Sequence, residues 1–505
     1  MLKSVLGTWG LNGLQMAALL VLSPWVLERL GADPNGLWTA LISITGILSL
    51  FILGVPMASV RAIAEGVARK DPAAVQRAVS TCMAICAALG LVALLVAGLA
   101  YLYFDARILR GTAGAGLDPQ TLDSARIAFG ILALQVACGF VMRLPYGILE
   151  AHSDFLARNA ISAFEVLLRF GTTLALLHWR AELAVLALVQ VICMLAEFTL
   201  ALIVLRRRHP SVHFSLRGYD PSAVRGILAF SIFAMLLNVG ALLAFRLDGL
   251  VISSFLPARA ATEFDIGNKF FDPLMQLLIS VGAVVMPMAT RLKTSGETQA
   301  LRAIFLRWSK LSLSLVLLTG GYLMVLGPEF LAWWVGEEYR KPSGDVLRVL
   351  MLSFFFYLPV RGVALPILMG LGKPRAPALC LLVMGVANLG ISLALVGPQG
   401  IFGVAIGTAL PNLAFAVIVL YLACKELEVG IGEWLVQSAL KPLLGACLPV
   451  LALILAAQLS GWGGFGALVA FGVGYVALFA LIWFAWVVRG DPDLDLLSRW
   501  KRRAA

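Results

Sequence analysis

Charged residues are scarce in this sequence. Asp, Glu, Lys and Arg make up only 13% of its 505 residues, whereas 61% are hydrophobic. A soluble globular protein carries about 25% charged residues, so these are too few to cover a surface that faces water. The composition excludes a water-soluble globular protein and indicates that much of the exterior faces lipid.

Residues that carry catalytic or metal chemistry are scarce too. The chain has four histidines, and its seven cysteines lie in or beside apolar runs. It has no Gly-x-x-x-x-Gly-Lys-Ser/Thr phosphate loop, no His-Glu-x-x-His and no Gly-x-Ser-x-Gly. The longest expected loops, near 105–124, 206–225 and 328–345, hold no acid–base constellation, which disfavours a membrane-bound polymerase, ligase or glycosyltransferase. We expect no metal, no cofactor, no disulfide, no enzymatic activity and no ATP-driven pump.

Hydrophobic segments of membrane-spanning length are abundant. A spanning helix needs roughly 20 mostly apolar residues. We expect fourteen such helices, at 5–30, 37–60, 79–104, 125–149, 157–178, 183–205, 226–247, 264–290, 308–327, 346–369, 376–396, 401–424, 440–459 and 465–488. The sequence therefore predicts an all-α polytopic membrane protein.

The basic residues predict its orientation. Of the 39 Lys and Arg residues, twenty-five lie in the N-terminus and every second segment after it, and seven lie in the intervening loops. Because basic loops stay in the cytoplasm, both termini are expected there. The net charge of +11 then requires no nucleic acid, and the runs 206–208 and 499–503 are expected against anionic headgroups.

The two halves of the chain resemble one another. The stretch that begins at Arg143 superposes without a gap on the stretch that begins at Gly362. Internal repeats are typical of transporters, so we expect two pseudo-symmetric six-helix lobes around a central cavity, with two further helices appended. The expected domains are an N-lobe at 1–205, a linker loop at 206–225, a C-lobe at 226–424, helices 13 and 14 at 425–488, and a basic tail at 489–505.

Four basic residues near or within the apolar segments are candidates for binding an anion. They are Arg143, Arg246, Lys269 and Arg361. Charge inside a membrane is costly and usually faces a wet cavity. Arginine suits phosphate oxygens because its guanidinium is planar and permanently charged. The alternatives are snorkelling to the headgroups and pairing with a nearby acid.

Acidic and amide residues form a second group of candidates. Asp248, Asp265 and Asp272 are candidates for relaying protons, binding a cation or closing a gate through ion pairs. Asp265, Asn268, Lys269 and Asp272 recur at spacings of three and four, which predicts one shared helix face. Asn238, Asn268 and Asn388 are candidates for sugar contacts or for hydrogen bonds between helices.

Two further acids lie in the fifth and sixth expected helices. Glu165 and Arg169 are four residues apart and are candidates for a simple ion pair. Glu197 has no evident partner in the sequence. Because an intramembrane carboxylate is costly, Glu197 is the harder of the two acids to explain structurally.

Several stretches resemble the polysaccharide-export branch of the MOP flippase superfamily. Segment 36–65, with its late proline and following basic loop, is similar to helix 2 of that family. Segment 245–292 resembles its helices 7 and 8, with Asp248 and Pro287 at matching places. The turn 365–375, LPILMGLGKPR, resembles the turn after its helix 10. Together with the helix count, the resemblance covers nearly the whole chain.

The resemblance implies a Wzx-type flippase of the bacterial inner membrane. Such proteins move undecaprenyl-pyrophosphate-linked oligosaccharides from the cytoplasmic to the periplasmic leaflet by alternating access through a cationic cavity. The implied pathways are polysaccharide, O-antigen or exopolysaccharide biosynthesis. The implied partners are this lipid-linked substrate, the bilayer, a counter-transported proton or cation, and polysaccharide polymerases.

Two other functions in the same superfamily stay open. Lipid II flippases also have fourteen helices but carry several arginines on helices 1 and 2, and the interior of helix 1 has none here. Cation-coupled multidrug exporters usually have twelve helices and an acidic cation site in helix 1 or 7. Here helix 1 has no acid before Glu28.

Overall fold

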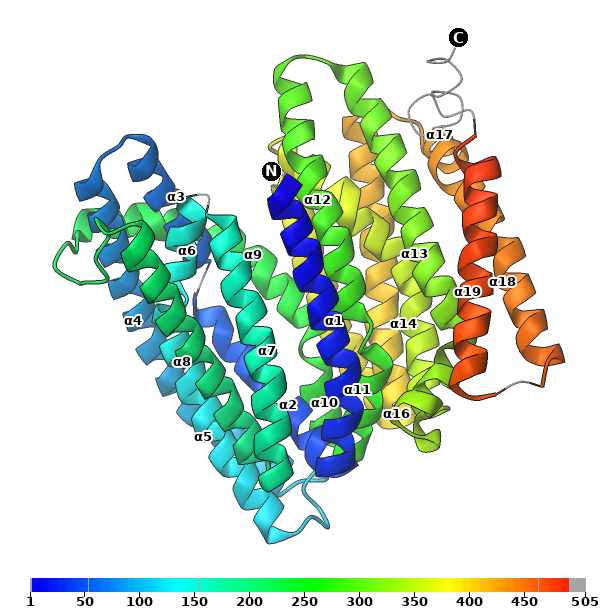
Figure 1. The fold of residues 1–505 in the computed structure, drawn as a ribbon, viewed down its shortest axis with the longest axis horizontal. Helices are drawn as coiled ribbons and strands as arrows, with labels where there is room; N and C mark the ends of the chain where they lie inside the picture. Colours follow the sequence, from blue (N-terminus) through cyan, green and yellow to red (C-terminus); the bar gives the residue numbers. More distant parts are fainter. Residues whose placement is uncertain (1, 53, 153, 462, 490–505) are drawn as a thin grey trace. The chain divides into compact units, whose positions relative to one another are not determined.

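The computed structural model describes residues 2–52, 54–152, 154–461 and 463–489, and all its regular elements there are helical (Figure 1). Within these residues, twelve helices are long and apolar enough to cross a membrane, or thirteen when one bent pair counts as a single span. One of the twelve merges two helices across a kink at Gly400, where φ is 59° and ψ is −141°. The expected all-α polytopic fold with about fourteen helices is therefore confirmed. The expected tail contacts at 499–503 lie outside the described residues.

The chain forms two compact units. Unit 1 comprises 1–262 and 396–400, and unit 2 comprises 263–395 and 401–505. The helices of unit 1 are α1 (Leu2–Leu30), α2 (Ala32–Leu48), α3 (Val55–Ala68), α4 (Pro72–Tyr103), α5 (Pro119–Met142), α6 (Leu144–Ala151), α7 (Phe155–Trp179), α8 (Leu183–Arg208), α9 (Pro221–Phe245) and α10 (Asp248–Phe255). The boundary between the units falls inside α11 (Ala258–Asn268).

Unit 2 continues the helical pattern with several π-helical turns. Its elements are α12 (Phe271–Thr294), α13 (Thr298–Val335), α14 (Pro342–Pro359), η4 (Val360–Ala364), α15 (Leu365–Gly370), α16 (Arg375–Glu426), α17 (Ile431–Trp434), η5 (Leu435–Leu440), α18 (Lys441–Leu459), α19 (Gly464–Ile482) and η6 (Trp483–Val487). Of these, η4, η5 and η6 are π-helices.

The boundary between the compact units differs from the expected division of the chain. The sequence placed α9 in the C-lobe, after a linker at 206–225. In the structure α9 packs against α3 and α4 and belongs to unit 1. The loop before α9 also bonds to α4, because Ser80 donates to the Ser215 carbonyl at 2.6 Å. The segment 206–225 therefore continues unit 1.

Asp-Pro pairs begin three of the long helices. Asp71, Asp118 and Asp220 each precede a proline at the first helical positions. The Asp71 carboxylate accepts from the Ala74 amide at 3.0 Å, and the other two caps bond in the same way. The carboxylate satisfies an amide with no helical partner, and proline needs no such partner. These pairs fix where α4, α5 and α9 start.

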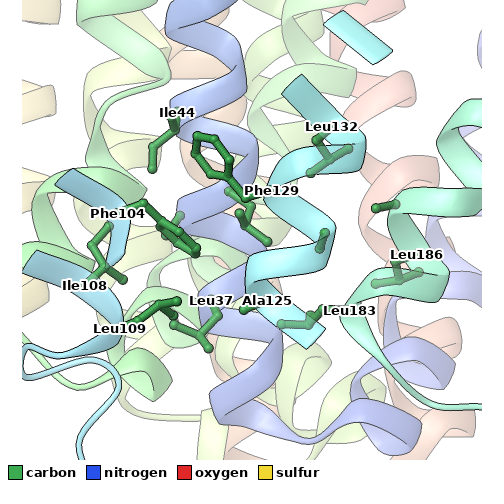
Figure 2. Packing of buried hydrophobic residues seen from close by; sticks show 14 of the residues in the cluster. Leu37, Ile44, Phe104, Ile108, Leu109, Ala125, Phe129, Leu132, Leu183 and Leu186 are labelled. Carbon is green, nitrogen blue, oxygen red and sulfur yellow. The ribbon is translucent and has the colours of Figure 1, made fainter. Parts of the chain in front are cut away.

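The interior of unit 1 is built by large side chains from α2, α4, α5 and α8. Figure 2 shows Phe129 of α5 beside Phe104, at the end of α4, and Ile44 of α2. The two phenylalanine rings stack with centroids 5.3 Å apart. Leu183 and Leu186 cover the other side of α5 (Figure 2). This cluster holds the four helices in one packed body.

Some expected helices are interrupted. The expected helix 37–60 is divided, because α2 and its short continuation end at Ile52 and α3 starts at Val55. Gly54 between them has a φ of 73°, a left-handed conformation that glycine adopts easily. The expected helix 308–327 is instead the much longer α13, which begins at Thr298. Turn residues inside apolar runs account for the first difference.

One glycine marks a close backbone approach in unit 1. A Cβ added to Gly36 on α2 would lie 1.8 Å from the Ala258 carbonyl oxygen. Small residues at such contacts let membrane helices pack closely. Gly130 on α5, by contrast, has open space around its added Cβ.

We expect Gly36→Ala to destabilise the protein by about 1–3 kcal/mol, because backbone must move to admit the methyl group. Gly130→Ala is the matched control and is expected to change stability by less than about 1 kcal/mol. Thermal unfolding of both variants in detergent measures the difference. Equal midpoints for the two variants would show that the contact at Gly36 relaxes freely.

Two histidine rings lie in contact, tilted by 39°, at one end of α6, α7 and α8. The rings of His152 and His209 lie with centroids 4.0 Å apart. Asp154 caps α7 and binds Nη1 of Arg208 at 2.7 and 2.8 Å, and its carboxylate lies 4.0 Å from His209 Nε2. Burial lowers the pKa of His209 below its usual 6.5, and the neighbouring His152 lowers it further.

This histidine pair predicts a loss of stability in acid. The folded protein binds the His209 proton less readily than the unfolded chain. Stability is therefore complete above about pH 6.5 and falls as the pH drops through that value toward the lowered pKa. Thermal unfolding from pH about 8 to about 5.5 should show this decline, and His209→Gln should reduce it. His213→Gln, an exposed histidine of the same loop, should leave the decline unchanged; a reduction there too would contradict the assignment.

Candidate functional site

Two of the expected anion-binding residues lie in unit 1. Arg143 is exposed at the junction of α5 and α6, where Pro145 begins the short α6. Arg246 is also exposed and ends α9. Breaks in helices therefore present both arginines at the surface of unit 1.

The bend after Arg246 buries a carboxylate. The segments Asn238–Phe245 and Asp248–Phe255 meet at 40°. Gly249 approaches α2 so closely that an added Cβ would lie 2.7 Å from the Ser43 hydroxyl. The first turn of α10 thereby packs on α2, and Asp248 is only 5% exposed. Asn238, one of the candidate sugar contacts, is exposed.

The other two expected cations lie in unit 2. Lys269 bonds to Asp265 with an N–O distance of 2.6 Å, and both side chains are partly exposed. The expected single face through Asp265, Asn268, Lys269 and Asp272 is wrong as a continuous helix face, because α11 ends at Asn268 and α12 starts at Phe271. The turn between them separates Asp272 from the ion pair, and Asp272 is exposed.

Close packing of α12 fixes the position of the segment that carries Arg361. A Cβ at Gly282 of α12 would lie 2.7 Å from Pro366, and a Cβ at Gly362 would lie 3.0 Å from Leu278. The two segments run parallel, since the later residue of one contacts the later residue of the other. Leu278 lies seven residues beyond Phe271, so the start of α12, which follows Lys269, differs in level from Arg361 by about 10 Å.

Arg361 occupies a π-helical turn. The turn η4 lies between Pro359 and Pro366, and Arg361 is half-buried in it. The fully buried Tyr357 hydroxyl, on α14, lies within electrostatic reach of the Arg361 guanidinium. π-Turns inside α-helices frequently occur at functional sites. Two prolines and a π-turn make this a distinctive setting for a guanidinium.

Lys310 is a buried cation that was not among the expected anion-binding residues. It lies on α13 and is 9% exposed. A Cβ at Gly320 of α13 would lie 2.9 Å from Met351 Sδ of α14, and α13 runs antiparallel to α14. Lys310 lies ten residues before Gly320, and Arg361 lies ten residues after Met351. Because the two helices are antiparallel, both steps lead in the same direction from the contact. Both cations therefore lie at one level of unit 2.

A hydrogen-bonded amide network lies in the interior of unit 2. Asn388 donates to the Thr408 hydroxyl at 3.2 Å and accepts from Ser392 at 3.0 Å. Asn412 donates to the Ser353 hydroxyl at 3.3 Å. Asn388 is only 2% exposed, so its amide links the two segments of α16. This is the helix-to-helix role considered for it as the alternative to sugar contact.

The structure thus distributes the candidate residues over both units. Arg143, Arg246 and Asp248 belong to unit 1, and Lys269 and Arg361 belong to unit 2. A single cavity lined by all four cations stays a prediction. Among the described residues, no group of three or more His, Cys, Asp or Glu side chains is arranged to hold a metal ion.

Comparisons with known proteins show which family and which relatives this chain is similar to. The sequence model of the family described as "Polysaccharide biosynthesis protein" matches residues 1–293. An uncharacterized membrane protein of Methanocaldococcus jannaschii is 23% identical over 216 residues, which is 42% of this chain and 41% of that protein. The chain therefore spans about two fifths of the length of that curated relative.

Solved structures share the fold at low sequence identity. The lipid II flippase MurJ in an inward closed conformation matches with a TM-score of 0.71 and 12% identity, over 96% of this chain and 99% of that chain. An inward-facing multidrug resistance MATE family transporter of the MOP superfamily matches with a TM-score of 0.67 and 14% identity, over 83% and 94%. The resemblance drawn from the sequence to this superfamily is confirmed. Because the family model matches more than half of the chain, the protein belongs to the polysaccharide biosynthesis protein family, and its fold is that of MOP-superfamily flippases and transporters.

Proposed function

We propose that this protein flips an undecaprenyl-pyrophosphate-linked oligosaccharide from the cytoplasmic to the periplasmic leaflet of a bacterial inner membrane, with both of its termini in the cytoplasm. The head group passes through a cationic cavity by alternating access while the polyprenyl tail stays in lipid. The flipped sugar then serves polysaccharide, O-antigen or exopolysaccharide synthesis, with a polysaccharide polymerase as the next partner. The family match supports this role.

The observation that carries the proposal is the pair of cations at one level of unit 2. Arg361 and Lys310 lie on packed neighbouring segments, in helices of membrane-spanning length. Two positive charges at one level attract an anion electrostatically. A pyrophosphate supplies two negative charges and acceptor oxygens for a planar guanidinium. Lys269, in the turn before α12, is the proposed next contact.

The remaining candidates keep their proposed roles. Arg143 and Arg246 bind the head group from unit 1, and Asn238 and Asn268 contact sugar hydroxyls. Asp248, Asp265 and Asp272 take part in coupling or gating. For Asp265 the ion pair with Lys269 supports gating, because breaking that pair would release both charges when substrate arrives. Asn388, bonded inside unit 2, supports the structure of α16.

Two other functions predict different substrates. A lipid II flippase would move the same pyrophosphate anchor with a peptide-bearing sugar. The fold similarity to MurJ is the observation that favours this second candidate. A multidrug exporter would move cationic compounds, which the cations Arg361 and Lys310 would repel. Proteoliposomes that offer each substrate in turn separate the three functions.

The charge of Arg361 and Lys269 is expected to be essential for flipping. Loss of a charged hydrogen bond of about 1.5–3 kcal/mol should reduce flipping of the lipid-linked oligosaccharide about 10- to 100-fold in Arg361→Ala. Lys269→Ala should behave likewise. Leaflet accessibility of the sugar in proteoliposomes measures both variants. Arg348→Ala, an exposed arginine of α14 that bonds to the Met324 carbonyl, is the matched control and should flip normally.

A double variant separates substrate binding by Lys269 from simple ion pairing. If Lys269 only neutralised Asp265, then Lys269→Gln combined with Asp265→Asn would restore flipping. We expect no restoration, because the neutral pair cannot attract pyrophosphate. Normal flipping by both Arg361→Ala and Lys269→Ala would remove the site assignment.

A further inference from the structure

An apolar pocket lies between α13 and α19 in unit 2. The two helices pack side by side, and the Tyr322 hydroxyl of α13 donates to the Leu468 carbonyl of α19 at 3.0 Å (Figure 1). The pocket has a volume of about 510 Å³ and is lined by Tyr322, Phe330 and one stripe of α19 from Phe465 to Ala477. Apart from the Tyr322 hydroxyl, which is already bonded, the lining side chains are apolar. The pocket therefore suits a hydrocarbon chain.

The length of the α19 stripe matches one leaflet of a bilayer. Phe465 and Ala477 are twelve residues apart, which corresponds to about 18 Å along the helix. The hydrocarbon core of a bilayer is about 30 Å thick, so each leaflet contributes about 15 Å. Phe465, Val469 and Val473 are exposed, so the stripe is open to the lipid around the protein. One lipid chain can thus lie along it through the depth of a single leaflet.

Aromatic rings mark one end of the pocket as the level of the head groups. The Trp333 ring of α13 stacks on the Phe465 ring of α19 with centroids 4.4 Å apart, and Phe330 lies beside Trp333 at 5.8 Å. Such rings gather where the bilayer meets water. Because α19 leads to the C-terminus that we place in the cytoplasm, its Phe465 end faces the periplasm. The pocket then belongs to the outer leaflet.

Glu329 lies at this outer end on the pocket side of α13. Tyr322, Glu329 and Trp333 are spaced by seven and four residues, so they share one helix face. The Tyr322 hydroxyl is within electrostatic reach of the Glu329 carboxylate. Glu329 Oε2 is buried and accepts no hydrogen bond from any described residue. Leaving a buried carboxylate oxygen without a donor is costly, so a ligand that supplies a donor would be bound favourably there.

Arg340 offers a second contact beside Glu329. Its Nε and Nη2 bond to Glu337 at 2.7 and 3.0 Å, whereas its Nη1 lies 3.8 Å from Glu329 Oε1, too far for a hydrogen bond. The outer segment from 329 to 341 carries three acids and two bases, a net charge of −1. A head group with both an ammonium and a phosphate fits these charges, since the ammonium can approach the acid and the phosphate the arginine.

We propose that this pocket binds phosphatidylethanolamine from the outer leaflet. One acyl chain lies along the α19 stripe, the ammonium donates to Glu329 Oε2, and the phosphate faces Arg340 Nη1. An ammonium group has three N–H donors, and its hydrogen bond to a carboxylate is among the strong ones. The proposal goes beyond the proposed function, because it concerns a lipid of the bilayer itself. Only the choice of leaflet depends on the orientation proposed above.

Anionic lipids fit this pocket less well. The polyprenyl tail of the proposed substrate ends in a pyrophosphate, which the acids Glu329, Glu337 and Glu338 would repel. Phosphatidylglycerol also carries a net negative charge and has no ammonium to pair with Glu329. The charges of the outer segment therefore favour a zwitterionic lipid with N–H donors over the other lipids that could offer a chain.

Lipid titrations of the purified full chain test the head group. Native mass spectrometry in detergent would measure the binding of dioleoyl phosphatidylethanolamine, phosphatidylcholine and phosphatidylglycerol. Phosphatidylcholine keeps the positive charge and the chains but has no N–H donor. Phosphatidylethanolamine should bind at least about tenfold more tightly than the other two, as expected for a charged hydrogen bond. Equal binding of the three lipids would overturn the head-group assignment, and so would tighter binding of polyprenyl pyrophosphate.

A charge-neutral variant tests the role of Glu329. Glu329→Gln should weaken phosphatidylethanolamine binding about tenfold or more and leave phosphatidylglycerol binding unchanged. Glu338→Gln, which changes an exposed acid of the same outer segment, is the matched control and should bind like the wild type. The thermal unfolding midpoint without added lipid checks that both variants are folded. Unchanged phosphatidylethanolamine binding by a folded Glu329→Gln would contradict the assignment of the ammonium contact.

A pocket-filling variant tests where the chain lies. Val473 lines the pocket and is 65% exposed, so Val473→Phe can fill the space without disturbing the core. It should weaken binding of phosphatidylethanolamine. Leu481→Phe, at a 66% exposed position of α19 outside the pocket, should not. Normal lipid binding by Val473→Phe would refute the pocket as the chain site. Loss of a dimer rather than of lipid in this variant would assign the stripe to a second copy of the chain and overturn the proposal.

Discussion

The cost of placing a polar group where no water can reach it governs this protein. In a lipid-embedded helix bundle, backbone and side-chain groups must find partners within the protein. The ion pair of Lys269 with Asp265 and the contact of Arg169 with both Glu165 and Gln190 meet that requirement. Cations carried by helices of membrane-spanning length then stand out as candidate sites for an anion.

Close backbone contact is the second requirement of the same environment. Lipid tails are as apolar as leucine, so helices gain little from hiding apolar side chains from lipid and depend on packing at short range. Gly36 against Ala258 in unit 1 and Gly282 against Pro366 in unit 2 provide it. The second contact has a functional consequence, because it holds the π-turn of Arg361 against α12. Packing and site geometry are linked at that point.

Much of the fold could be predicted from the sequence because membrane spans have a strong compositional signal. The apolar segments, the similarity of the two halves of the chain and the resemblance to a flippase superfamily all pointed to one architecture. Local breaks were harder to predict. Gly54 adopts a left-handed conformation inside an apolar run, and the turn after Asn268 divides a spacing pattern that reads as one helix face. A single residue in an unusual conformation hardly changes the hydropathy pattern, so the pattern does not predict it.

The candidate site was less predictable for a related reason. Lys310 follows Arg302 and Arg307 closely and lies at the start of the expected helix 308–327, so it was not singled out as an intramembrane charge. Its burial depends on α13 beginning at Thr298, and the apolar positions Leu301 and Phe305 are the signal that would have extended that helix. Charge distribution alone cannot separate a basic loop from a helix end that is basic and buried. The helical periodicity of the apolar residues on both sides of the expected helix start separates these two cases.

The membrane potential acts on the charges of the proposed transport cycle. A membrane potential that is negative inside contributes about 2.3 kcal/mol per charge per 100 mV, and it favours outward movement of an anionic pyrophosphate. After release the empty site keeps the positive charge of Arg361, and the same potential favours its return inward. On this reasoning the loaded site moves with little net charge, because the cations and the pyrophosphate cancel, and the potential drives the return of the empty site.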